Sequence, residues 1–128
     1  MSVPAPYSLS AADAADAVAS GRLSSVDLVK SCLARIEETD GEIKAWAHLD
    51  GDAALAQAAE CDRIRKAGLA TGPLHGVPVG LKDIIDTADM PTQRGTAIFA
   101  GRTTDTDARI VEHLREAGAV IMGKTVTT

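Results

Sequence analysis

Two periods of hydrophobic and polar positions run along the chain, and the longer one predicts four helices. Apolar residues recur three or four positions apart in residues 10–21, 24–40, 52–68 and 105–118. Ser10 and Ser24 begin the first two segments, each with an aspartate three residues later, which is a capping-box pattern. We expect Asp105 or Thr106 to cap the fourth helix. Its predicted inward face is Ile110, Val111, Leu114 and Ala117.

The shorter period, in which apolar and polar residues alternate, predicts a half-buried strand over residues 43–49. We expect its inward residues to be Ile43, Ala45, Ala47 and Leu49, opposite Lys44, Trp46 and His48. Two apolar runs, residues 76–85 and 119–122, predict two further strands. We expect an unstructured arm over residues 1–8, and residues 86–104 keep no period. Helices that alternate with strands indicate an α/β fold.

Composition excludes several classes of function. The 128 residues fit one domain or part of a larger one, and a formal charge of −5 without a basic run argues against direct nucleic-acid binding. No apolar stretch approaches the roughly 20 residues that span a bilayer, and the N-terminus lacks a signal sequence. We expect reduced thiols at Cys32 and Cys61 and no metal site at His48, His75 or His113, which lack a second ligand at metal spacing. The sequence predicts a soluble cytoplasmic protein.

Lys82 is the candidate catalytic residue, because it lies in an apolar strand where a lysine is energetically costly. Burial would lower its pKa from about 10.4 towards roughly 5–6, and an amine that is neutral near pH 7 is a general base. The alternative is that Lys82 ends an edge strand and extends its ammonium into water. We expect Asp83 to point to the opposite side of the strand. The local sequence leaves both interpretations of Lys82 open.

A second lysine, Lys124, lies in a segment that matches the P-loop expression G-x-x-x-x-G-K-[ST]. The match runs from Gly118 to Thr125. A P-loop follows a strand and precedes a helix, whereas here a predicted helix comes first and the x positions have the apolar pattern of a strand. We therefore prefer the strand interpretation to nucleotide binding.

The chain resembles the amidase-signature family of serine hydrolases. The residues that carry the resemblance are Pro73-Leu74-His75-Gly76-Val77-Pro78-Val79, Lys82-Asp83, Asp86-Thr87, Met90-Pro91-Thr92, Arg94-Gly95-Thr96 and the segment from Asp105 to Thr125. Their order and spacing are highly specific, and the helical N-terminal region fits the family's usual lead-in. Thr96 stands where many members have serine, and Ile84 stands where many have a polar residue.

The resemblance implies a fold, a reaction and a role for Lys82. The fold would be the N-terminal portion of a single amidase domain, with helices alternating with strands of a mixed sheet that is incomplete in this chain. Its parts would be the arm (1–8), a helical lead-in with one strand (10–70), and the lysine-bearing strand, loop, helix and strand (71–128). The reaction would be hydrolysis of an amide carbon–nitrogen bond by a serine–cis-serine–lysine triad, with Lys82 as the catalytic lysine and no cofactor or metal.

The resemblance also indicates what this chain lacks. Both serines of the triad lie, in the family, beyond the segment that ends at Thr125, and the serines present, all between Ser2 and Ser31, do not replace them. Because the chain stops six residues after Met122 without a closing helix, we expect it to be truncated. In such a fragment Lys82 is expected to be wetter, with a more ordinary pKa.

Three settings stay open. In the first, the chain is part of an amidase for a small-molecule amide, and residues 1–128 alone are inactive because the base lacks its nucleophile. In the second, it belongs to the amidase component of a tRNA-dependent amidotransferase. In the third, it is a non-catalytic remnant or interaction module whose exposed strand edges associate with a missing C-terminal part or with a second copy.

Overall fold

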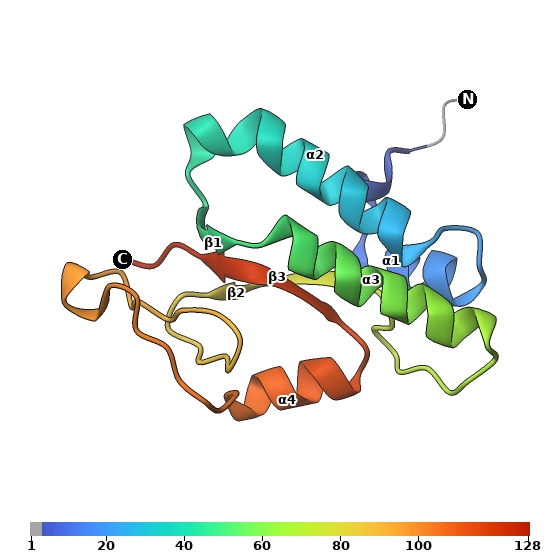
Figure 1. Ribbon diagram of the computed structural model, residues 1–128. Coiled ribbons are helices and arrows are strands. Elements are labelled where there is room, and N and C mark those ends of the chain that lie inside the picture. The colour runs from blue at the N-terminus through green and yellow to red at the C-terminus, as the bar shows by residue number, and fades with distance from the viewer. Residues whose placement is uncertain (1–3) are drawn as a thin grey trace.

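The computed structural model describes residues 4–128 as helices packed on a small sheet (Figure 1). In chain order the elements are the 3-10 turn η1 (Pro6–Ser8), α1 (Ala11–Ala19), α2 (Ser25–Ile43), β1 (Trp46–Leu49), α3 (Gly51–Lys66), β2 (Pro78–Lys82), the 3-10 turn η2 (Ala97–Phe99), α4 (Arg109–Glu116) and β3 (Val120–Thr125). The predicted α/β class is confirmed. The predicted arm is wrong at η1, where the Tyr7 amide donates to Ser31 Oγ (3.0 Å), while residues 1–3 of that arm lie outside the described residues.

Side-chain caps begin the first three α-helices. Ser10 Oγ and Ser24 Oγ accept hydrogen bonds from the amides of Asp13 and Asp27, both at 3.0 Å, as the capping pattern predicted. Asp50 begins α3 in the same way, with its carboxylate 3.0 Å from a backbone nitrogen of the first turn. The caps of α1 and α2 were therefore predicted from local sequence, whereas the Asp50 cap of α3 was not.

The end of α2 differs from the prediction. The helix continues through Gly41 to Ile43 and ends at Lys44, which has a left-handed φ of 55°. The Lys44 amide donates to Asp40 O (2.8 Å), and the Ala45 amide donates to Asp40 Oδ1 (2.7 Å). A glycine inside a helix costs only about 1 kcal/mol, so these terminal bonds, rather than Gly41, determine where α2 ends.

The longer helix changes which face of β1 is buried. The strand begins only at Trp46, and its pairing with β3 shifts register between Trp46 and His48. Trp46 and Leu49 pack against the core, whereas Ala47 is exposed and Ile43 keeps 66% of its surface exposed. The expectation that Ile43 and Ala47 face inward and Trp46 outward is therefore wrong, because Ile43 belongs to α2 and a bulge between Trp46 and His48 interrupts the alternation.

β3 is the central strand of a mixed sheet with the order β1-β3-β2. It pairs antiparallel with β1 and parallel with β2. β1 passes so close to β3 that a Cβ on Gly123 would overlap the carbonyl oxygen of His48. β1 and β2 are the two outer strands among the described residues, so the backbone of each pairs on one side only.

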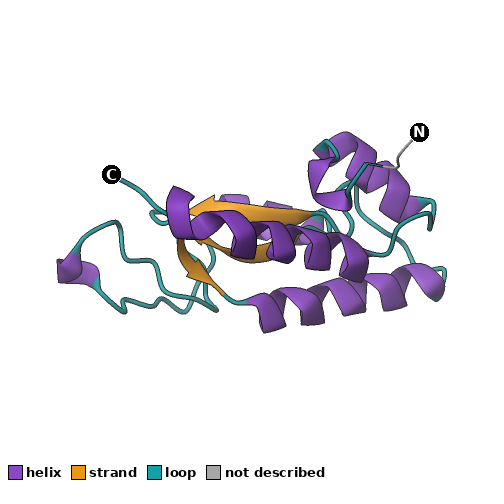
Figure 2. Ribbon diagram, turned by 90° about the horizontal axis from the view of Figure 1, so that it is seen from above, coloured by secondary structure: helices purple, strands orange, loops and turns teal. Residues whose placement is uncertain are grey.

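Helices cover both faces of this sheet (Figures 1 and 2). One face packs on α2 and α3 through the buried residues Val29, Ala54, Ala58, Val120 and Met122. The other packs on α4 and the loop before it through Leu81, Met90, Val111 and Ile121. Gln57 of α3 also binds the backbone of Ile121, donating to its carbonyl and accepting from its amide at 3.0 Å each. Helix α3 is therefore fixed to the central strand by apolar and polar contacts.

A buried carboxylate on α3 fixes the start of α2. Asp62 accepts hydrogen bonds from the amides of Ser25 (2.7 Å) and Val26 (3.0 Å), and only 7% of its surface is exposed. Ser25 Oγ in turn donates to the carbonyl of Gly76 (2.7 Å), just before β2. A negative charge is stabilising at a helix N-terminus, where backbone amides carry partial positive charge. Asp62 thus joins two helices at the point where β2 begins.

Helix α4 begins later than predicted. Its N-cap is Ala108, which has no side-chain hydrogen bond and whose amide donates instead to Asp86 O (2.9 Å). The expected caps, Asp105 and Thr106, lie outside the helix. With this later start Val111 is fully buried and Ile110 is 55% exposed. The prediction that Ile110 faces inward is therefore wrong. Backbone contact with the preceding loop replaces a side-chain cap.

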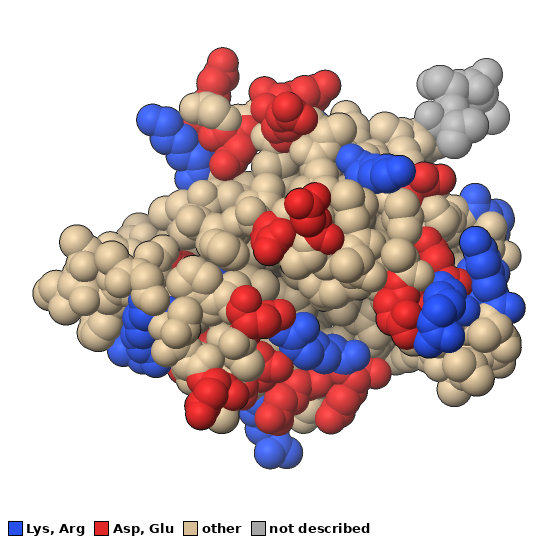
Figure 3. Space-filling model, in the orientation of Figure 1, with Lys and Arg blue, Asp and Glu red and all other residues tan. Residues whose placement is uncertain are grey.

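Charged residues are spread over the face seen in Figure 3, but the tip of the projecting end that holds η2 carries none on that face. Ile98 and Phe99 lie at this end, and Ile98 is 86% exposed. Within residues 4–128, none of the helices combines the length and the apolar character needed to cross a bilayer.

Candidate active site

Lys82 is the last residue of β2 and lies where the parallel strands β2 and β3 both have their carboxyl ends. Its backbone pairs with Thr125, the last residue of β3. In sheets with parallel strands, ligands bind in the crevice outside the carboxyl ends of the strands. The topology therefore places the lysine predicted from the sequence at the carboxyl ends of the strands, where a ligand is expected to bind.

The Lys82 side chain is exposed in this chain, as expected for a fragment, so the interpretation of Lys82 as a buried strand lysine does not hold here. Leu81, one residue earlier, is buried against α4, and side chains alternate along a strand, so Lys82 points to the opposite face. That face includes Gly80, where a Cβ would lie 2.7 Å from the Trp46 ring. β2 is an outer strand and Lys82 is exposed at its end, so the edge-strand alternative describes Lys82 correctly.

Asp83 anchors the backbone beside Lys82. It is 2% exposed and lies on the other side of the chain from Lys82, as predicted. Its amide donates to Thr125 O (2.9 Å), its carbonyl accepts from the Arg94 amide (2.9 Å), and its Oδ1 accepts from the Gln93 amide (3.1 Å). Three hydrogen bonds therefore fix the residue that follows the candidate base.

A mostly apolar hollow of about 260 Å³ lies on the Gly80 face of the sheet. It is lined by Tyr7, Cys32, Arg35, Ile36, Trp46, Pro78, Gly80 and Met122. The Arg35 guanidinium lies over the Tyr7 ring at 5.3 Å and also pairs with Glu38. The hollow lies beside β2, on the face toward which Lys82 points.

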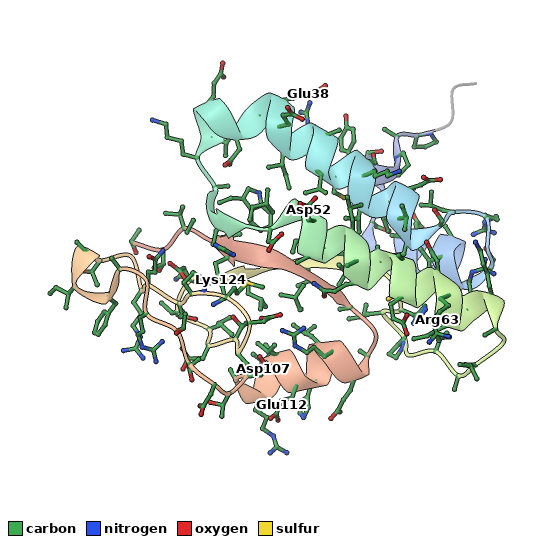
Figure 4. The ribbon with its side chains drawn as sticks, viewed as in Figure 1. Glu38, Asp52, Arg63, Asp107, Glu112 and Lys124 are labelled. Atoms are coloured by element: carbon green, nitrogen blue, oxygen red, sulfur yellow. The ribbon has the colours of Figure 1, made fainter. Side chains whose placement is uncertain are left out.

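The lysine that is fully buried is Lys124, which sequence reasoning assigned only to the end of a strand. Lys124 has 0% of its surface exposed, and burial lowers the pKa of its ammonium, while the negative charges of Asp83, Asp86 and Asp89 act in the opposite direction. Figure 4 shows its side chain on the side of β3 that faces the loop before α4. The burial of Lys124 could have been predicted from the apolar run at 119–122. Such a run is typical of a strand that is buried on both faces, and a lysine in that strand is enclosed.

The P-loop interpretation fails on the same geometry. Gly118 and Ala119 follow α4, and the rest of the match forms β3, with Lys124 inside the strand. The Lys124 ammonium donates to protein oxygens and is enclosed, so it cannot reach a phosphate outside the sheet.

The remaining candidate groups have structural surroundings. His75 is buried with Nε2 2.7 Å from the carbonyl of Cys61, and His113 is exposed on α4. Burial raises the pKa of both thiols, Cys32 and Cys61, which are free cysteines. No group of three His, Cys, Asp or Glu side chains in residues 4–128 is arranged to hold a metal ion.

Two arginines hold the loop between β2 and α4. Arg102 donates to Asp86 (2.8 Å), and this hydrogen bond lowers the pKa of the Asp86 carboxyl. Arg115 of α4 binds Asp107 (2.9 Å) and Asp89 (3.1 Å). The Arg102 pair joins two parts of the irregular segment, and the Arg115 pairs join that segment to α4.

Known proteins resemble both the sequence and this arrangement. The family described as Amidase matches residues 27–128. A glutamyl-tRNA(Gln) amidotransferase subunit from Thermobifida fusca is 48% identical over 117 residues, which cover 91% of this chain and 24% of that protein. The structure of peptide amidase from Stenotrophomonas maltophilia has a TM-score of 0.87 at 42% identity. The match covers 95% of this chain and 26% of the peptide amidase. A fatty acid amide hydrolase has a TM-score of 0.88 at 28% identity, covering 99% and 23%.

The chain spans about a quarter of the length of these relatives. The family match nevertheless takes in most of residues 4–128, including β2, the loop after it, α4 and β3. The helices and mixed sheet correspond to the N-terminal part of the fold of these neighbours. On these grounds the chain belongs to the Amidase family, the amidase-signature enzymes that its motifs indicated.

Proposed function

We propose that Lys82 is the general base of an enzyme that cleaves an amide carbon–nitrogen bond, and that this chain is the N-terminal portion of its single amidase domain. One observation carries the proposal: Lys82 combines the family's lysine motif with a position at the carboxyl ends of β2 and β3. Within residues 4–128 its amine has no hydrogen-bond or ion-pair partner, and Asp83 fixes the backbone beside it. An unpaired amine on a fixed backbone is suited to accept a proton.

The reaction needs a nucleophile from elsewhere. Each serine hydroxyl in the described part of the chain is bonded to a backbone group, namely those of Ser8, Ser10, Ser20, Ser24, Ser25 and Ser31. In the proposed reaction, Lys82 takes the proton of a serine hydroxyl through a bridging serine as the nucleophile attacks the amide carbonyl. The proton then passes to the leaving amine. The segment that supplies these serines would also cover Lys82, and desolvation would favour its neutral form.

The proposed reaction uses no cofactor or metal, and its substrate is a small-molecule amide. We expect the enzyme to work in the cytoplasm, where its two thiols stay reduced. Residues 1–128 alone are expected to be inactive, because a base without a nucleophile leaves acyl transfer incomplete.

A chimera tests the proposal. This chain would replace the matching quarter of the Stenotrophomonas maltophilia peptide amidase, and hydrolysis of a peptide amide would be measured. Lys82→Ala should lower kcat by at least about 10²–10⁴-fold, the usual contribution of a general base, whereas Lys30→Ala on the exposed side of α2 should not. An active chimera that keeps its rate with Lys82→Ala would refute the assignment.

A second candidate is the amidase component of a tRNA-dependent amidotransferase. The favouring observation is the 48% identity to the Thermobifida fusca glutamyl-tRNA(Gln) amidotransferase subunit, which exceeds the 42% identity to the peptide amidase. The same replacement in that subunit separates the two. Amide transfer to glutamyl-tRNA(Gln), with little hydrolysis of a peptide amide by the first chimera, would favour the amidotransferase. The opposite pair of results would favour the amidase.

A further inference from the structure

The ammonium of Lys124 is buried without a carboxylate beside it. Its Nζ donates to the carbonyl of Pro91 (3.1 Å) and to Thr92 Oγ1 (2.5 Å), and both Lys124 and Thr92 have 0% of their surface exposed. Among residues 4–128, no Asp or Glu oxygen lies within 4.0 Å of this nitrogen. A lysine is almost never fully buried unless it is paired, so this arrangement requires a reason.

Packing alone does not supply that reason. A methionine would fill a similar volume without the desolvation of a charge, and replacing buried charges by apolar groups is often neutral or stabilising. An ammonium, unlike a methionine side chain, donates hydrogen bonds and so holds acceptor oxygens at specific positions. Lys124 uses this to hold two successive residues, 91 and 92, of the loop that returns along the end of β2.

A short series of hydrogen bonds leads from Lys124 to Asp83, the residue after Lys82. Thr92 is followed by Gln93 and Arg94, whose amides donate to Oδ1 (3.1 Å) and O (2.9 Å) of Asp83. The Asp83 amide donates to the carbonyl of residue 125, one position after Lys124. Lys124 is therefore part of a closed set of hydrogen bonds. Lys124 of β3 binds the returning loop, the loop binds Asp83, and Asp83 binds the end of β3.

We propose that Lys124 is a positioning residue for Lys82. By fixing residues 91–94 against the end of β3, its ammonium holds Asp83 from two sides and sets the direction in which Lys82 leaves β2. The importance of that direction rests on the proposed function of Lys82, whereas the mechanical link between Lys124 and Asp83 does not.

Amide hydrogen exchange in this chain tests the link, read by NMR. In Lys124→Met the amides of Asp83, Gln93 and Arg94 should exchange at least about tenfold faster than in the wild type, which corresponds to roughly 1.4 kcal/mol of lost local protection. The Asp50 amide, which donates to Met122 O between α3 and β3, should change no more than the global stability does. Lys66→Met, at the exposed end of α3, is the matched control and should leave all four amides unchanged.

A second pair of variants keeps the test decisive if Lys124→Met does not fold. Thr92→Val removes the hydroxyl that accepts from Lys124 but preserves the size of the side chain, and Thr92→Ser keeps the hydroxyl. Thr92→Val should speed exchange at Asp83, Gln93 and Arg94, and Thr92→Ser should not. Equal acceleration of all amides, or equal behaviour of the two Thr92 variants, would overturn the proposal.

The chimera described for Lys82 supplies the catalytic readout. Lys124→Met should lower kcat about tenfold with KM unchanged, because displacement of a catalytic group by about 1 Å can cost up to 10²-fold in rate. A rise in KM with unchanged kcat would contradict a positioning role. If an active chimera keeps its rate with Lys82→Ala, the proposed function of Lys82 fails, while the exchange rates still decide whether Lys124 positions Asp83.

Discussion

Removal of the Asp62 carboxylate should strongly destabilise the chain, because this group holds the start of α2 from α3. Asp62 accepts two backbone hydrogen bonds, at 2.7 and 3.0 Å, and is 7% exposed. A hydrogen bond to a charged group contributes about 1.5–3 kcal/mol, so two of them set an upper range of about 3–6 kcal/mol. Val26 is only half-buried, so water can reach part of the site in the variant. We therefore expect Asp62→Ala to lower the free energy of unfolding by about 3–4 kcal/mol.

Two further variants calibrate this value. Asp62→Asn keeps one acceptor oxygen but turns an amide group toward the second N–H, and should cost about 1–2 kcal/mol. Asp27→Ala removes an exposed acid from the first turn of the same helix and should cost about 0.3–1 kcal/mol through the helix dipole alone.

Urea unfolding followed by far-UV circular dichroism measures all three variants against the wild type. The midpoint gives the change in stability if the slope m is constant, and a changed m would show altered compactness instead. The reasoning would be refuted by an Asp62→Ala variant within 0.5 kcal/mol, roughly the error of such comparisons, of Asp27→Ala. In that case the buried carboxylate contributes no more than an exposed one.

Two other predictions use the same unfolding assay. Gly123→Ala should destabilise the chain by roughly 2–4 kcal/mol because its Cβ would overlap the His48 carbonyl oxygen, whereas Gly41→Ala, which has open space around it in α2, should stabilise it by about 0.5–1 kcal/mol. Equal effects of the two would contradict the close approach of β1 and β3. The pKa of Asp86 is lowered in the folded chain, so its stabilisation is present above its ordinary pKa of 3.8 and is lost as the pH falls through the lowered value. Asp86→Asn should flatten this acid limb by less than about 1 kcal/mol, because the pair with Arg102 is partly exposed; an unchanged pH profile would exclude the ion pair as its source.

The starts of α1 and α2 and the order of elements could be predicted from the sequence because they depend on local chemistry. The hydroxyls of Ser10 and Ser24 accept from amides three residues away, and such bonds are written in the sequence itself. Two other helix boundaries depended on bonds to backbone amides instead. The end of α2 at Lys44 and the start of α4 at Ala108 are set by bonds to Asp40 and Asp86 that no periodicity reveals.

The candidate site divides in the same way. The family motif and the strand pattern identified Lys82 and the side on which Asp83 lies, both of which need only residues close in the sequence. The exposure of Lys82 and the enclosure of Lys124 depend on which strand is central, and pairing order is a property of the whole chain. A lysine in an apolar run is therefore buried or exposed according to the place of its strand in the sheet.

The position of β3 between β1 and β2 also bears on how the chain is made. The middle strand is translated after both of its neighbours, which do not pair with each other. On a ribosome adding roughly 5–20 residues per second, the 43 residues from Lys82 to Thr125 take about 2–9 s. During that interval α2 and α3 can pack together through Asp62, while β2 has no partner strand. Nascent chains of this protein are therefore expected to need shelter from association until residue 125 has emerged.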